Sequence, residues 1–125
     1  LVGINLSLMA LWNVYDYEKL HILTASNVFQ LGIVWCVATH IGLPHARLNG
    51  KRIRYVSVSM SIISFIGMFY AVALGFERYP EFAEGDWDME KMQPYINWAA
   101  PFEYLMVFSF MLTLKSFEQE LVHTE

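Results

Sequence analysis

The sequence predicts an all-α protein, a single polytopic bundle of transmembrane helices with four spans. Only 16% of the 125 residues are charged, whereas 56% are hydrophobic. A soluble domain carries roughly a quarter charged residues. Residues 20–46 and 55–76 contain no Asp, Glu, Lys or Arg, and about 20 such residues suffice for a helix to cross the hydrocarbon core of a bilayer. A soluble domain of this length has room to bury one such helix but not several.

Four apolar segments make up most of the chain, and each is expected to be one span. They are residues 1–15, 20–43, 55–76 and 94–117. Backbone groups in lipid must find hydrogen-bond partners within their own segment, so helices are expected. The alternating pattern of a membrane β-barrel is absent. Ser64, Gly67 and Ala71 give the third segment a face of small residues, which favours close helix packing.

The connecting segments differ sharply in charge and so predict the topology. Residues 45–54 hold four of the eight Lys and Arg residues and no acid, whereas residues 77–91 hold six acids against two bases. Short loops rich in Lys and Arg remain on the cytosolic side. We therefore expect a cytosolic loop at 44–54, a luminal or extracellular loop at 77–93 and a cytosolic tail at 118–125. Asn49 and Gly50 favour a tight turn in the basic loop.

The basic loop has two interpretations. It serves membrane insertion alone, or its cations also bind anionic lipid headgroups, each gaining about 1 kcal/mol near such a surface. The residues expected at the headgroups are Arg47, Lys51, Arg52 and Arg54.

Two ionisable residues fall inside the predicted spans, His21 at the start of the second and Glu103 within the fourth. An intramembrane acid costs about 2.5–3.5 kcal/mol on insertion scales, so it is expected to have a polar neighbour. Because prolines and an asparagine precede Glu103, we expect the helix proper to begin near Ala99, which puts Glu103 in the outer half of its span. His21 then forms a polar clamp with it, as a structural contact or as a proton sensor.

The sequence shows no catalytic, cofactor or metal site. Its four histidines lack the spacing of metal ligands. Cys36 and His40 lie one helical turn apart, but nothing nearby would orient them or stabilise an oxyanion. Phosphate-binding loops and nucleic-acid signatures are also absent. We therefore expect a protein that is not an enzyme and does not bind nucleic acid.

The fourth segment resembles the last span of the damage-regulated autophagy modulator (DRAM) family and its Frag and Sfk-type relatives. The residues that carry this resemblance are Ala99, Ala100, Glu103, Tyr104, Ser109, Phe110, Phe117 and Glu118. The second segment resembles the family's helix of a histidine and small residues, with His21 in the matching place. The loop containing Asn49, Gly50 and Lys51 resembles the family's basic cytosolic turn. The resemblance implies a six-span bundle of which this chain supplies the last four spans, with upstream sequence missing.

Family members are regulators rather than enzymes. The resemblance therefore implies a non-enzymatic membrane regulator or scaffold linked to phosphoinositide and membrane-lipid homeostasis and to autophagy. Its expected partners are anionic membrane lipids and other membrane or cytosolic proteins, and its expected location is the plasma membrane, an endolysosomal membrane or the endoplasmic reticulum. One alternative is an auxiliary subunit of a larger channel or lipid-transport assembly. A second alternative is a lipid-modifying enzyme or transporter, which needs a polar cavity at Glu103 and His21.

Overall fold

The computed structural model describes residues 1–12, 16–43, 48–82, 84–85 and 88–121, with four α-helices and one short 3₁₀ helix. The helices are α1 (Val2–Leu11), α2 (Glu18–Gly42), α3 (Leu48–Arg78), η1 (Pro80–Phe82) and α4 (Met89–Leu121). None of these residues forms a strand. The prediction of an all-α chain is confirmed, and the chain holds two helices long and apolar enough to cross a membrane, α2 and α3.

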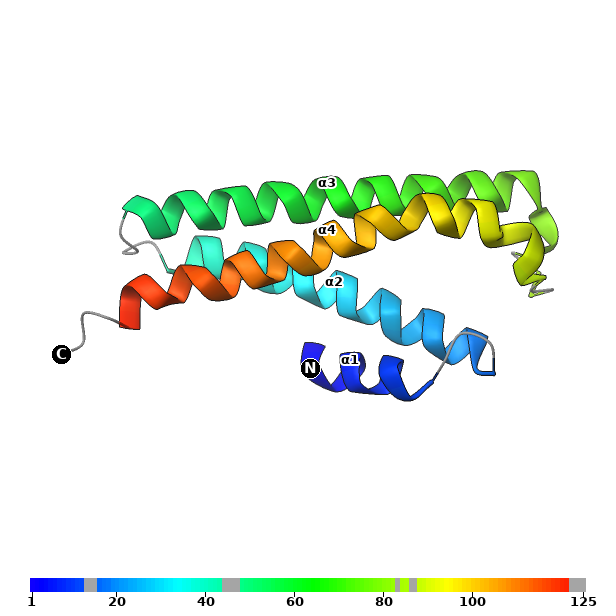
Figure 1. The fold of residues 1–125 in the computed structure, drawn as a ribbon, viewed down its shortest axis with the longest axis horizontal. Helices are drawn as coiled ribbons and strands as arrows, with labels where there is room; N and C mark the ends of the chain where they lie inside the picture. The colour runs from blue at the N-terminus through cyan, green and yellow to red at the C-terminus, as the bar shows by residue number, and fades with distance from the viewer. Residues whose placement is uncertain (13–15, 44–47, 83, 86–87, 122–125) are drawn as a thin grey trace.

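The antiparallel pair α3 and α4 forms the body of the molecule (Figure 1). Helix α2 crosses this pair obliquely and packs on both helices, and α1 packs against α2. The end of α2, the start of α3 and the end of α4 lie at one end of the bundle, while the start of α2, the end of α3 and the start of α4 lie at the other (Figure 1). The basic and acidic segments of the sequence are therefore separated by the length of the helices.

Helices α3 and α4 meet along stripes with a seven-residue repeat. On α4 the fully buried positions Met92, Ala99, Met106 and Thr113 recur every seven residues. On α3 the corresponding stripe consists of Arg54, Ser57, Ser61, Ser64, Ala71 and Gly75. This spacing is that of left-handed coiled-coil packing. Small side chains on α3 let the two backbones approach closely.

Two glycines receive aromatic rings from α4. A Cβ at Gly67 of α3 would lie 2.3 Å from Phe102, and a Cβ at Gly32 of α2 would lie 2.0 Å from Phe110. Any side chain at either glycine would overlap the ring. These contacts fix the positions of α3 and α2 along α4.

Among the described residues, many of the buried side chains are polar, while many large apolar side chains are exposed. The buried polar residues are Thr24, Thr39, Arg54, Ser57, Ser61, Ser64, Ser109, Thr113 and Ser116. Large apolar side chains point outward, for example Ile63, Phe69 and Met111, each about 60% exposed. Only 33% of the most apolar window of α2 and 22% of that of α3 are buried. Core helices of soluble proteins are mostly buried, so this pattern favours an apolar surrounding.

Helix boundaries differ from the prediction at both polar ends. Helix α3 begins at Leu48, so Asn49 and Gly50 are helical and the predicted turn is wrong. Helix α4 begins at Met89 and continues through Pro94 and Pro101, so the predicted start near Ala99 is also wrong. A membrane helix tolerates internal prolines because neighbouring groups satisfy the freed backbone carbonyls.

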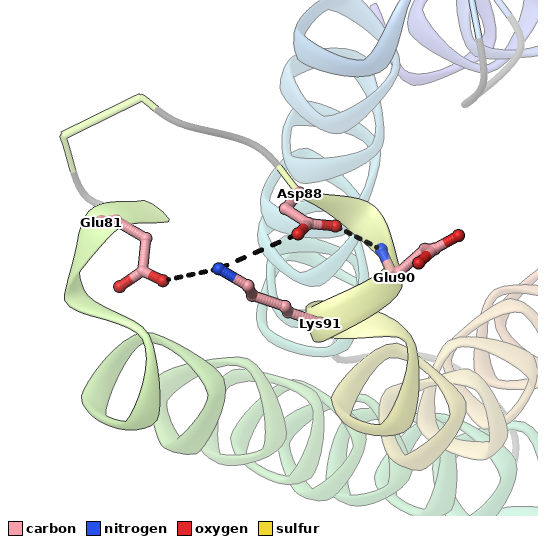
Figure 2. Close-up of polar contacts among 4 residues, drawn as sticks. All are labelled: Glu81, Asp88, Glu90 and Lys91. Atoms are coloured by element: carbon pink, nitrogen blue, oxygen red, sulfur yellow. Dashed lines mark hydrogen bonds and ion pairs between the residues drawn. The ribbon is translucent and has the colours of Figure 1, made fainter.

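The start of α4 is fixed by side chains of the acidic segment (Figure 2). The Asp88 carboxylate accepts a hydrogen bond from the Glu90 backbone N–H at 3.1 Å, which satisfies one of the free amides of the first turn. The Lys91 ammonium lies 3.1 Å from a Glu81 carboxylate oxygen and 3.8 Å from one of Asp88. These contacts tie η1 to the first turn of α4.

Candidate functional site

The basic cluster divides between the surface and the interior. Lys51 and Arg52 are exposed, but they lie on the first turns of α3 and not in the predicted loop 44–54. Arg47 lies outside the described residues. Arg54 is only 1% exposed, so its expected place at the headgroups is wrong. Arg54 occupies the helix face that bears Ser57 and Ser61, and helical periodicity therefore turns it toward α4.

The buried Arg54 side chain connects three helices. Its Nε–H donates to the Ser116 hydroxyl of α4 at 2.9 Å, and its Nη1–H donates to the Leu43 carbonyl, just beyond α2, at 3.0 Å. The guanidinium also lies 5.1 Å from the centre of the Phe117 ring, within cation–π range. Hydrogen bonds of this charged kind contribute about 1.5–3 kcal/mol each. Arg54 is therefore a clamp at the basic end of the bundle.

A polar cluster follows one turn deeper, where α2, α3 and α4 meet. The Ser57 hydroxyl donates to the Ser109 carbonyl at 2.6 Å and hydrogen-bonds the Thr113 hydroxyl. The Thr113 hydroxyl lies 3.3 Å from the buried Cys36 sulfur of α2. These bonds satisfy polar groups that would otherwise be costly inside an apolar bundle. The cluster thus provides interhelical contacts, and sequence reasoning missed it except for the small-residue face of α3.

Glu103 lies near the middle of α4, level with the uncharged stretch of α3. Its neighbour Phe102 packs on Gly67, which is close to the centre of the uncharged stretch 55–76 of α3. On α4, the nearest formally charged residues are Lys91 and Lys115, each twelve positions away. At 1.5 Å per residue, this is about 18 Å on either side. Glu103 therefore lies midway between the charged residues of its helix, and its side chain is half-buried. Its place in the outer half of a membrane span stays a prediction.

His21 has a backbone partner instead of the predicted partner Glu103. The structure describes no hydrogen bond or ion pair between them, and His21 Nδ1 instead lies 2.7 Å from the Trp12 carbonyl. The hydrogen-bonded clamp predicted between His21 and Glu103 is therefore not formed in the part of the chain that the structure describes.

The acidic end contains an ion-pair network. The pKa of Glu81 is lowered, first by the backbone N–H at Glu81 itself and then by the Lys91 ammonium. Within the described part of the chain, no three His, Cys, Asp or Glu side chains are arranged to hold a metal ion. The carboxylates of Glu81 and Asp88 have backbone or lysine partners.

Comparison of the chain with family models, curated proteins and solved structures finds no match. The resemblance to the DRAM family therefore stays a proposal.

Proposed function

We propose that this chain is the membrane-embedded part of a non-enzymatic, multi-pass regulator or scaffold of the DRAM type. The single observation that supports this proposal most is the burial of hydroxyls between the helices together with the exposure of many large apolar side chains. Polar side chains that bond across helices are typical of membrane bundles. In this proposal all four helices are embedded. Helix α1 packs against α2.

The basic end faces the cytosol in this proposal, because short cationic segments remain there. Lys51 and Arg52 are exposed at that end and would meet anionic headgroups, including phosphoinositides. The acidic connection between α3 and α4 would face the lumen or the exterior. The link to lipid homeostasis and autophagy comes from the resemblance, and the endolysosomal and plasma membranes are the proposed locations.

Native mass spectrometry of the chain released from nanodiscs tests the lipid part of this proposal. The nanodiscs contain phosphatidylcholine with a minor fraction of phosphatidylinositol 4-phosphate. We expect the wild type to retain the phosphoinositide and the double variant Lys51→Ala/Arg52→Ala to lose about 30-fold in affinity, from about 1 kcal/mol per cation. Lys19→Ala/Arg78→Ala removes the same charge at the other end and serves as the matched control. Equal retention by both double variants would contradict the proposal.

A second candidate, a subunit of a larger membrane assembly, is favoured by Tyr104. This residue follows the mid-span Glu103, yet it is 78% exposed and no hydrogen bond is described for its hydroxyl. Tyrosine hydroxyls in membrane proteins usually lie at the water interface or find a partner. A photo-crosslinking amino acid at position 104 tests this candidate in cell membranes. A single defined protein adduct would support the subunit role, and adducts to lipid alone would contradict it.

A further inference from the structure

Gln30 is a polar side chain on the outer surface of the apolar helix α2. It lies near the centre of residues 20–43, which contain no Asp, Glu, Lys or Arg. Its side chain is exposed, and its amide has no hydrogen-bond partner in the part of the chain that the structure describes. An amide in hydrocarbon is costly without a partner, because lipid tails neither donate nor accept hydrogen bonds. A membrane-embedded α2 therefore needs a polar group from another molecule opposite Gln30.

Gln30 belongs to the side of α2 that faces away from the bundle. The buried side of α2 meets the other helices, at Gly32 under the Phe110 ring of α4 and at Cys36 beside hydroxyls of α3 and α4. Gln30 and Val34 each precede one of these buried residues by two positions. Two positions correspond to about 200° around a helix, so both side chains point to the opposite side. Helix α1 packs on α2 but leaves Gln30 exposed.

Four residues at successive helical turns form this outer side of α2, and we call them the α2 ridge. They are Gln30, Val34, Ala38 and Gly42, and all four are exposed. Nothing lies within 4 Å of a Cβ built at Gly42. Ala38 and Gly42 are small residues four positions apart, a spacing that lets two membrane helices approach closely. The α2 ridge therefore combines a hydrogen-bonding side chain with space for the backbone of a second helix.

Membrane insertion restricts how a second copy of the chain can meet the α2 ridge. The charge pattern gives every copy the same orientation, so a closed dimer has its two-fold axis along the membrane normal. The two α2 helices then run parallel, and each residue meets its counterpart at the same depth. A glutamine amide contains both donors and an acceptor, so two Gln30 side chains can each donate to the other. A second copy therefore supplies the partner that a single copy lacks.

We propose that the α2 ridge is a homodimer interface in which the Gln30 amides of two copies hydrogen-bond to each other within the membrane. This inference rests on the membrane-embedded bundle of the proposed function, but not on its regulatory role. Flotation with liposomes distinguishes the two failures. A chain that floats with the liposomes but stays monomeric refutes the interface alone, whereas a chain that does not associate with them refutes the embedded bundle and the interface together.

Energy transfer between copies in phosphatidylcholine liposomes tests the interface. Full chains carry a donor or an acceptor dye at Glu84→Cys in a Cys36→Ala background, and transfer is measured as the protein is diluted with lipid. We expect transfer above the level of random encounters. Gln30→Leu should weaken association about eightfold, because it removes two interhelical hydrogen bonds of about 0.6 kcal/mol each. Gln93→Leu removes an exposed glutamine near the start of α4 and should change nothing.

Further variants separate the amide from the shape of the α2 ridge. Gln30→Asn keeps an amide at this position and should retain the association. Gly42→Leu extends into open space in a single copy but into the second helix of a dimer, so it should weaken association about tenfold. Gly3→Leu on α1 is the matched control, because nothing lies within 4 Å of a Cβ there either.

Circular dichroism checks that each variant keeps its helices. Transfer no greater than that of random encounters in the wild type, as expected if lipid or a different protein covers the α2 ridge, would overturn the proposal. Equal association of the wild type and Gln30→Leu would also overturn it.

Discussion

The ring of Phe102 occupies the space in which a side chain at Gly67 would lie, since a Cβ there would be 2.3 Å from the ring's Cε1 atom. This contact sets how α3 and α4 are aligned along the bundle. It places the acid that follows Phe102 opposite the middle of the longest uncharged stretch of α3. The position of Glu103 along the bundle therefore depends on a glycine of another helix, Gly67, which lies 36 residues earlier in the chain.

Gly67→Ala should destabilise the bundle. Glycine to alanine in a helix normally gains up to about 1 kcal/mol, but overpacking a tight contact costs about 1–3 kcal/mol. Unfolding in mixed micelles, followed by circular dichroism, should show a net loss. Gly3→Ala is the control, because nothing lies within 4 Å of its Cβ. Phe102→Leu should rescue part of the loss, and equal effects of the two alanine variants would refute the alignment.

Replacing Arg54 should affect stability rather than lipid binding. Arg54→Gln removes the charged donor to Ser116 and to the Leu43 carbonyl, with an expected cost of about 3 kcal/mol. Arg52→Gln, two positions earlier and exposed, should change the free energy of unfolding by less than about 0.5 kcal/mol but weaken phosphoinositide retention. The same unfolding and lipid-retention measurements separate the two roles. Equal destabilisation by both variants would disprove a buried clamp.

The acidic end should lose stability at low pH. The pKa of Glu81 in the folded protein is lowered from its ordinary value of 4.5 by the backbone N–H at Glu81 and by Lys91. A lowered pKa stabilises the folded protein at pH values above the ordinary pKa of the group. This stabilisation is lost as the pH falls through the lowered pKa of the folded state. Side-chain NMR of Glu81 should show the low pKa, and Lys91→Met should raise it toward 4.5. Because the site is exposed, added salt should reduce the difference. An unchanged titration in Lys91→Met would exclude the ion pair.

Composition and charge pattern were sufficient to predict the helices, because long uncharged stretches leave few alternatives. They did not predict where the helices begin. Helix α3 begins at Leu48 and helix α4 at Met89, both within polar sequence. Tertiary contacts and the Asp88 cap stabilise these starts. The burial of Arg54 could not be predicted either. Within a basic run, only the phase of the helix distinguishes a buried arginine from exposed Lys51 and Arg52, and that phase becomes visible once α3 is known to begin before them. The hydrogen bond between the Ser57 and Thr113 hydroxyls depends on how α3 packs on α4. A single sequence does not show which distant segments pack together.

Cysteine accessibility in sealed vesicles tests the central claim, that the bundle spans a membrane with its basic and acidic ends on opposite sides. Lys51→Cys and Glu84→Cys are made separately in a Cys36→Ala background, and each is labelled with a membrane-impermeant maleimide before and after permeabilisation. We predict that, in vesicles of one orientation, one position is labelled at once and the other only after permeabilisation. Immediate labelling of both positions in intact vesicles would contradict this account.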